Sequence, residues 1–564
     1  MIPIALNPGF ALVIGAGLAL AAPQAIRTTL MALSGIAACA LILAPPFGDY
    51  DRFAQIGLQL VPLRLDALSQ IFGLSFAIGA ILISFAASYR RRRMEDVAIM
   101  LMAGGATSAA FAGDLISFVA ASEVSALAGA WIVFSAGGRA ALESGVRLLI
   151  WQGLGGLLLF SGIALHLADG FNSAFTRLPA DSVGGALCLA GLGIKAAAPF
   201  AHVWFREALS TSSPTGAAAL SLFSAKLALY GLARGFTGES ILSPAGAAMA
   251  VMGALMALAD EDLRRALAFS LIGQIGLVIA AIGVGAPLAL AGAAGHVFTT
   301  SIAYVLLVLA AGVVCERAGT TRMSELPRVI APMPFTAILV LLGGLSAAAI
   351  PGFAGYISES LALEAIARSG RFWSWVAIAA ASAGVVAFAA VRLPALFLGG
   401  RGATQAGAPF GVLLAMALGA FLCIAIGLAP GWLLEILPPA PVAYDAYAID
   451  RLGERLEFKA AAAAGFAGLL WLGLTHGRRE RWLNDVDAFY RGPLAAAARE
   501  LGRFSQQVYG GVSRANDALM GRGARGLLGL TRLADAPASA TRAGPVVGAL
   551  IMLGALILMY AMVR

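Results

Sequence analysis

The stretch LCLAGLGIKAAAPFAHVWF, residues 187–205, decides the fold, because it places a charge and a helix breaker inside one apolar run. Lys195 lies within the run, and Pro199 should interrupt the helix four residues later. Irregular backbone at membrane depth is tolerated where it is buried in protein or lines a wet cavity. The stretch therefore predicts a broken membrane helix that carries an ionisable side chain.

The composition of the whole chain agrees with a membrane protein. Of its 564 residues, 60% are hydrophobic and only 12% are charged, whereas a soluble globular chain carries about 25% charged residues. Apolar runs of nearly the length that crosses a bilayer recur throughout. We predict an all-α polytopic membrane protein, which excludes a soluble enzyme, a nucleic-acid binder and a secreted disulfide scaffold.

Arginine distribution predicts the orientation of the spans. We expect about sixteen spans, centred at about residues 12, 36, 76, 104, 124, 157, 193, 225, 252, 275, 302, 341, 385, 419, 467 and 553. Connections after odd-numbered spans hold most of the arginines, including Arg27 in the first connection, the run Arg90–Arg93 and the pair Arg264 and Arg265. By the positive-inside rule these connections are cytoplasmic and the N-terminus lies outside.

Lysine usage singles out two positions. Only three of the 38 basic residues are lysines, and two of them, Lys195 and Lys226, lie inside apolar runs. An intramembrane charge costs at least about 2.5–3.5 kcal/mol on insertion, so it is a functional candidate. Lysine loses its proton far more readily than arginine, which favours a proton-carrying role. The third, Lys459, opens a later span, where we expect its side chain to snorkel to water.

Glu123 is the matching buried acid, in DLISFVAASEVSALAGAWIVF at 114–134. A lone buried charge is neutralised by its environment, so we expect Glu123 to pair with Lys195 and both to stay charged. Weakening that pair would release a proton. The alternative is a static ion pair that sets helix register.

Three more groups lie at membrane depth. His296 opens the apolar run at 295–312, where a proton relay and a satisfied core histidine both remain open. Glu359 follows IPGFAGYIS at 350–358, where proline and glycine should break a second helix, and it either joins the axis or faces water. His202, after Pro199, either relays protons or bonds a freed carbonyl.

Cysteine and charge patterns exclude other roles. The four cysteines are far apart and form no CxxC pair, so we expect no metal, no redox cofactor and no enzyme site. The net charge of +8 comes from short basic clusters between apolar runs, which indicates membrane loops in contact with lipid and not nucleic-acid binding.

Several motifs taken together carry a family resemblance over roughly residues 60–400. They are Asp66 and Ser69 in LRLDALSQIF, the stretch Asp114–Glu123, Lys195 with PFAHVWF, Lys226–Gly231 with Arg234, Asp262 with the two arginines after it, His296 with Gly312, MPFT at 333–336 and GGLS at 343–346. The chain resembles the antiporter-like subunits of respiratory complex I, membrane-bound hydrogenases and Mrp-type sodium/proton antiporters. LNDVDAFYR at 483–491 looks most like the D-type component of the Mrp antiporters.

The resemblance implies about fourteen core helices in two inverted five-helix repeats with two broken helices, plus about two C-terminal spans. It also implies an axis of Glu123, Lys195, Lys226, His296 and Glu359, with His202 and Tyr304 in support. The expected segments are 1–94 with spans 1–3, 95–240 with the first repeat, 241–400 with the second, 401–476 with spans 14–15, 477–543 as a cytoplasmic amphipathic segment, and 544–564 as the last span.

We therefore expect a proton-translocating subunit of a multi-subunit cation/proton antiporter in the bacterial cytoplasmic membrane. Other membrane subunits would be its partners, protons its cargo and sodium the candidate counter-ion. Two alternatives remain. One is the same channel in a redox-driven complex of the hydrogenase or NADH:quinone oxidoreductase type. The other is a scaffold that recruits a soluble partner for inorganic-carbon uptake.

Overall fold

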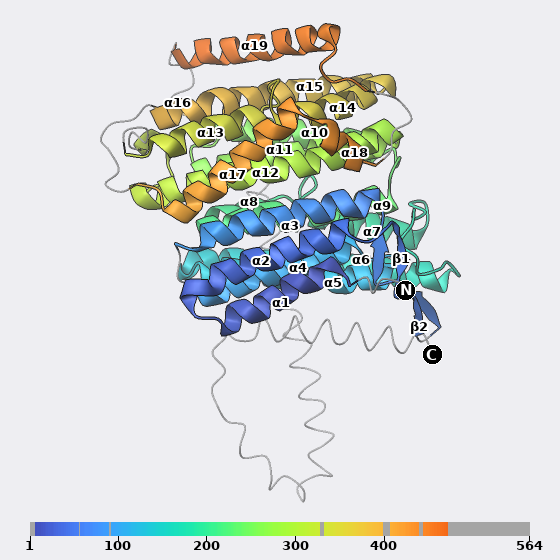
Figure 1. Ribbon diagram of the computed structural model, residues 1–564. Coiled ribbons are helices and arrows are strands. Elements are labelled where there is room, and N and C mark those ends of the chain that lie inside the picture. Colours follow the sequence, from blue (N-terminus) through green and yellow to red (C-terminus); the bar gives the residue numbers. More distant parts are fainter. Residues whose placement is uncertain are drawn as a thin grey trace, which may run out of the picture. The chain divides into compact units, whose positions relative to one another are not determined.

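The computed structural model describes residues 6–55, 57–89, 92–326, 332–398, 407–438 and 444–471. Most of them are helical (Figure 1). Ten of the described helices are long and apolar enough to cross a membrane, and three shorter apolar helices accompany them. The predicted all-α polytopic membrane fold is confirmed. The predicted span at about residue 553 and the segment 477–543 lie outside the described residues.

The N-terminal part holds four helices and two short antiparallel strand pairs. The helices are α1 (Pro8–Ala21), α2 (Gln24–Leu43), α3 (Ala67–Ala87) and α4 (Arg93–Ala110). Between α2 and α3, β1 (Gly48–Tyr50) pairs with β4 (Leu63–Leu65), and β2 (Phe53–Gln55) pairs with β3 (Leu58–Leu60). Asp66 caps α3 in a reciprocal capping box with Ser69, which fixes where the span begins.

The next helices carry the first group of candidate site residues. They are α5 (Leu115–Ser135), α6 (Gly138–Ala168), α7 (Val183–Lys195), α8 (Val203–Thr211) and α9 (Pro214–Gly235). Helix α7 ends at Lys195, and the chain resumes as α8 after an irregular segment in which Ala197 and Phe200 have φ of 57° and 71°. Two left-handed residues reverse the chain here. The expected break at Pro199 is therefore present.

The following helices contain the second break. They are α10 (Leu242–Ala259), α11 (Leu263–Val284), α12 (Pro287–Ala318), the 3₁₀ turn η1 (Met323–Glu325), α13 (Pro334–Ala347), α14 (Ala354–Arg368), α15 (Phe372–Val385), the π-helical η2 (Val386–Arg392) and α16 (Leu393–Leu398). Between α13 and α14, Ala349 and Gly352 have φ of 51° and 90°. A β-carbon on Gly355 would lie 2.0 Å from the Ser346 carbonyl oxygen, so only glycine fits this close approach.

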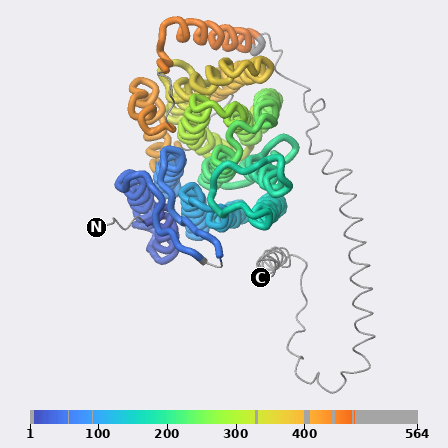
Figure 2. Tube along the Cα trace, turned by 90° about the vertical axis from the view of Figure 1, so that its right-hand side faces the viewer, coloured from blue at the N-terminus to red at the C-terminus, as the bar shows by residue number. Residues whose placement is uncertain are grey.

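Three helices complete the described part: α17 (Phe410–Leu428), α18 (Gly431–Ile436) and α19 (Ile449–Trp471). Helix α19 packs along α15 and η2, and both views place it at the edge of the helix array, far from α1 (Figures 1 and 2). The predicted span centres up to about residue 467 all fall within helices.

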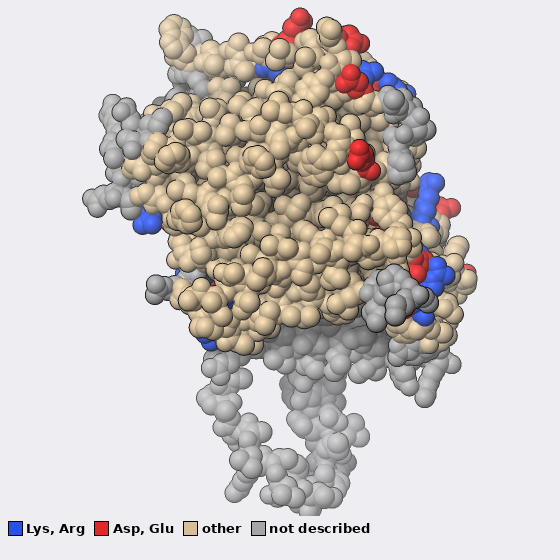
Figure 3. Space-filling model, viewed as in Figure 1, with Lys and Arg blue, Asp and Glu red and all other residues tan. Residues whose placement is uncertain are grey.

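Burial separates the inner helices from the outer ones. The most apolar window of α12 is fully buried, whereas that of α6 is 39% buried. Helices α9 and α11 are nearly as enclosed as α12 and pack against it. The face drawn in Figure 3 is largely free of charged side chains across its middle, as a lipid-facing belt requires. A charged side chain buried inside the helix array is costly, so it needs a partner.

One arginine lies elsewhere than the loop pattern predicts. Arg27, assigned to the first connection, lies within the first turn of α2 and is 5% exposed. Its guanidinium binds the Asp96 carboxylate of α4 at 3.0 Å. Because the turn between α1 and α2 is only two residues long, the arginine is drawn into the helix array and is paired there.

Candidate functional site

Glu123 and Lys195 form a direct ion pair. Lys195 is the last residue of α7, and its Nζ lies 2.7 Å from Oε1 of Glu123 on α5. The Gln152 side-chain oxygen on α6 accepts a second, longer hydrogen bond at 3.4 Å. The two charged side chains are 6% and 15% exposed. Each compensates the charge of the other inside the array, as buried charges require.

Two glycines on α6 make room for this pair. A β-carbon on Gly156 would lie 2.5 Å from Oε1 of Glu123, and one on Gly155 would lie 3.0 Å from Cγ of Lys195. A small cavity of about 20 Å³ adjoins the pair, between Lys195, Gln152 and Ser224. That volume admits a single water molecule. The Lys195 side of the pair therefore borders a space that reaches residues of α9.

Lys226 lies on α9 and is 2% exposed. Its Nζ donates to the Ser301 hydroxyl of α12 at 3.0 Å, and the Ser75 hydroxyl of α3 donates to the same oxygen at 2.8 Å. Within the described residues no carboxylate forms an ion pair with Lys226. Within the described contacts this ammonium therefore lies at membrane depth with the Ser301 hydroxyl as its partner, unlike Lys195, which pairs with a carboxylate.

His296 on α12 connects two other helices. Its Nε2 lies 2.6 Å from the Gln274 side-chain oxygen of α11, and its Nδ1 lies 3.0 Å from the Ser358 hydroxyl of α14. Gln274 also donates to the Ala347 carbonyl at the end of α13, at 3.1 Å. The imidazole thus has a partner at both nitrogens, which fits a relay and equally fits a satisfied core histidine.

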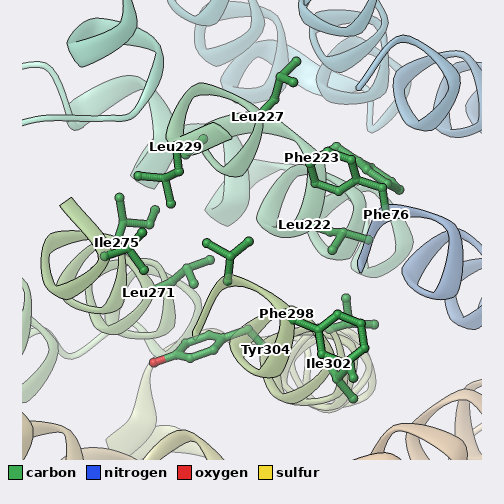
Figure 4. Packing of buried hydrophobic residues seen from close by; sticks show 14 of the residues in the cluster. Phe76, Leu222, Phe223, Leu227, Leu229, Leu271, Ile275, Phe298, Ile302 and Tyr304 are labelled. Carbon is green, nitrogen blue, oxygen red and sulfur yellow. The ribbon is translucent and has the colours of Figure 1, made fainter. Parts of the chain in front are cut away.

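Apolar packing surrounds these polar groups. Figure 4 shows Leu229 of α9 close to Leu271 and Ile275 of α11, while Phe298 of α12 lies on the other side of its helix, next to Ile302. Tyr304 lies in the same cluster, and its hydroxyl meets that of Ser270 at 2.6 Å. The described contacts form separate polar islands, so a continuous proton path between Lys226 and His296 requires water.

Glu359 on α14 is 2% exposed, which removes the alternative that it faces water. Its Oε1 lies 2.9 Å from Nζ of Lys459 on α19, and it also accepts from the Ser382 hydroxyl of α15 at 2.8 Å. The expectation that Lys459 snorkels is wrong, because its side chain is 3% exposed. Helix α19 lies along α15 and η2 and turns this lysine inward.

His202 lies in the first break, immediately before α8, and is fully buried. Its ring centroid is 6.0 Å from that of Phe269 on α11. This contact places the imidazole between the broken helix and α11. Its role as a relay stays a prediction.

The sequence reasoning missed several buried carboxylates, of which Glu95 is the most enclosed. Glu95 on α4 is 1% exposed and accepts hydrogen bonds from Ser213 and Thr215 at the start of α9. It lies two residues after the arginine run, so its position in the sequence resembles that of an ordinary loop residue. Only the packing of α4 against α9 reveals that it is enclosed.

Two groups of comparisons place the chain among known proteins. A family model described as NADH:quinone oxidoreductase/Mrp antiporter, TM, matches residues 112–384. Hydrogenase-4 component B of Escherichia coli (strain K12) is 25% identical over 465 residues, covering 71% of this chain and 67% of that protein. A component of a probable K(+)/H(+) antiporter of Rhizobium meliloti (strain 1021) is 24% identical, covering 55% of this chain and only 33% of the relative.

Solved structures show the same fold. A chain in the structure of the Mrp complex from Dietzia sp. DQ12-45-1b superposes with a TM-score of 0.74 at 24% identity, covering 92% of this chain and 63% of that one. The matched family segment contains Glu123, Lys195, Lys226, His296 and Glu359. Residues 112–384 of this multi-pass membrane protein are similar to the transmembrane family of NADH:quinone oxidoreductases and Mrp antiporters.

Proposed function

We propose that the chain is the proton-translocating subunit of a multi-subunit cation/proton antiporter. The observation that carries the proposal is Lys226, an ammonium buried at membrane depth that bonds the Ser301 hydroxyl and forms no ion pair in the described residues. Burial disfavours the charged form of an ionisable group. A lysine in such a place is suited to losing and regaining a proton, which a structural cation is not.

The Glu123–Lys195 pair would control the charge of Lys226. Two unit charges 4 Å apart interact by about 4 kcal/mol at an effective dielectric of about 20. One pKa unit corresponds to about 1.36 kcal/mol. Separating or forming one ion pair therefore suffices to move a proton off a nearby amine. The proton would then pass along the hydroxyls of Ser301 and Ser75 and through water.

The second half of the path would run from Lys226 past His296 to Glu359. Ser358 supports this route, because its hydroxyl bonds His296 and its neighbour in sequence is Glu359. We place the chain in a bacterial cytoplasmic membrane with its N-terminus outside, in contact with other membrane subunits. Sodium is the candidate counter-ion, and the chain itself holds no redox cofactor and is no enzyme.

The test is proton flux in vesicles that contain the complete complex. Lys226→Ala and Glu123→Ala should each lower flux by about tenfold or more, because a proton-transfer group typically contributes at least that much. Arg139→Ala is the control, since that side chain is 91% exposed and bonds its helical neighbour Glu143. Full flux in both axis variants would remove the proposal.

Neither alternative gains support from the buried contacts. A scaffold needs no ionisable side chains at membrane depth. Full activity of the double variant Lys195→Leu with Lys226→Leu would therefore indicate a scaffold. A redox-driven complex would copurify with subunits that carry iron–sulfur cysteine motifs. Affinity purification of the tagged chain, followed by identification of its partners, therefore distinguishes a redox-driven complex from an antiporter.

A further inference from the structure

We infer that Lys459 on α19 is a proton-carrying residue that forms, with Glu359, a second glutamate–lysine site at the end of the axis. The inference rests on the proposed function and adds to it an element outside the matched family segment, since α19 lies beyond residue 384. Lys459 and Glu359 are 100 positions apart in sequence. Only the docking of α19 brings them together.

The first argument is the number of hydrogen-bond acceptors around the side-chain nitrogen of Lys459, Nζ. It donates to the Ala348 carbonyl at 2.8 Å, to Glu359 Oε1 at 2.9 Å and to the Ser382 hydroxyl at 3.2 Å. An ammonium has three donor hydrogens, and each has an acceptor here. Ser382 in turn donates to the same Glu359 oxygen. This is a site built for a charged lysine, not a side chain that happens to be enclosed.

The second argument is the position of that ammonium relative to the broken helix. Lys195 ends α7 immediately before the first break, and Ala348 is the C-terminal cap of α13 immediately before the second. A helix C-terminus favours a cation through its free carbonyls and dipole. Both breaks therefore place a lysine ammonium at the end of the first half-helix, paired with a glutamate from another helix. In the second half, α19 supplies the lysine that α13 lacks.

The charge changes follow from this geometry. When a proton arrives at Glu359, an O–H bond forms and the carboxylate becomes neutral. Lys459 then loses its counter-ion while it remains buried, which favours breaking one N–H bond and releasing that proton to water. The carboxylic proton of Glu359 then moves to the neutral Lys459 amine, which breaks the O–H bond, forms an N–H bond and restores the ion pair, so one proton enters and one leaves in each cycle. Arg455, one turn away on α19, bonds the Ser360 carbonyl at 3.4 Å and takes no part in the exchange.

The decisive variant is Lys459→Arg in the complete complex. Arginine keeps the positive charge and the ion pair but stays protonated in proteins. A proton carrier therefore predicts that flux falls by about tenfold or more, whereas a structural clamp predicts unchanged flux. Arg455→Lys on the same helix is the matched control and should keep full flux. Hydrogen exchange of α19 shows whether the helix stays docked.

Full flux in Lys459→Arg with loss of flux in Lys226→Ala overturns this inference and leaves the proposed function standing. If Lys459→Arg releases α19, the deciding variant is Lys459→Cys in a background without the four native cysteines. Alkylation with 2-bromoethylamine rebuilds a primary amine of nearly lysine length. Recovery of flux with this amine, but not with the fixed charge installed by (2-bromoethyl)trimethylammonium, supports the inference, and equal recovery with both reagents, or none despite complete alkylation, overturns it.

Discussion

At the scale of single residues, the ion pairs depend on space as much as on charge. Gly156 leaves the room in which the Glu123 carboxylate reaches Lys195, since a β-carbon there would lie 2.5 Å from Oε1. Gly156→Ala should therefore displace the carboxylate and lower proton flux. Gly153→Ala on the same helix is the control, because a β-carbon there meets nothing within 4 Å. Equal flux in the two variants would show that the pair tolerates displacement.

The Glu123–Lys195 pair also makes a stability prediction. Removing one partner of a buried pair leaves an uncompensated charge and typically costs about 3–5 kcal/mol. Glu123→Gln and Lys195→Met should each destabilise the protein, and their combination should cost less than the sum of the two. Thermal unfolding of the detergent-solubilised complex measures the difference. Additive losses would indicate that the two side chains do not interact.

The rarity of lysine in this chain explains which buried charged residues could be predicted from the sequence. Lys195 and Lys226 stand inside long apolar runs, so their burial was predictable. Lys459 has five other charged residues within the nine positions before it, among them Asp450, Glu454 and Arg455, and resembles an interfacial residue. Its burial comes from the packing of α19 on α15 and η2, which no local pattern encodes. The clue was the lysine itself, in a chain that otherwise uses arginine.

At the scale of elements, hydropathy predicts the spans because the bilayer requires about 20 apolar residues in each. The two strand pairs could not be predicted, since strands of three residues are too short to show an alternating pattern. Helix α14 was expected only as the second half of a broken helix and not as a span of its own. Its polar residues Ser358, Glu359 and Ser360 are buried by neighbouring helices, and they lower the apolar character by which spans are recognised.

The second break makes an element-scale prediction. Ala349 has φ of 51°, a left-handed conformation that costs a non-glycine residue about 1 kcal/mol or more. Ala349→Gly should therefore leave stability unchanged or raise it slightly. Ala347→Gly, at the end of α13, should lower stability by about 0.5–1 kcal/mol because glycine weakens a helix. Thermal unfolding separates the two, and equal losses would mean that the break is not strained.

At the scale of the whole molecule, the two halves share a pattern of caps. Asp114 caps α5 and Asp262 caps α11, and each residue also forms an isolated β-bridge, with Ala174 and Arg322 respectively. In both halves a long helix and then a broken helix follow the capped one. This correspondence supports the proposed repeats at 95–240 and 241–400. It could be suspected from sequence only through the two breaks, because the caps look like ordinary loop acids.

The ion pair between Asp49 and Arg64, which lies outside the membrane spans, predicts how the stability of the protein responds to acid. Hydrogen bonds from Arg64 lower the pKa of the Asp49 carboxyl, and burial opposes them only in part. A carboxyl whose folded pKa is depressed contributes stability above its unfolded pKa of about 3.9, and that contribution is lost as pH falls through the folded value. Asp49→Asn should therefore lower stability at neutral pH and have little effect well below pH 3.9. Melting curves across that range test the sign.

Whether the two halves act in series or in parallel has a measurable consequence. In our proposal the Glu123–Lys195 pair controls proton release from Lys226, and the released proton must then pass the Glu359–Lys459 site, so the slower of the two steps limits the flux. Glu123→Gln and Glu359→Gln should then each remove most of the flux, and the double variant should be scarcely worse than the poorer single one, because sites in one path are not additive. Two independent half-channels would behave differently. Each single variant would retain the flux of the untouched half, and only the double variant would abolish transport.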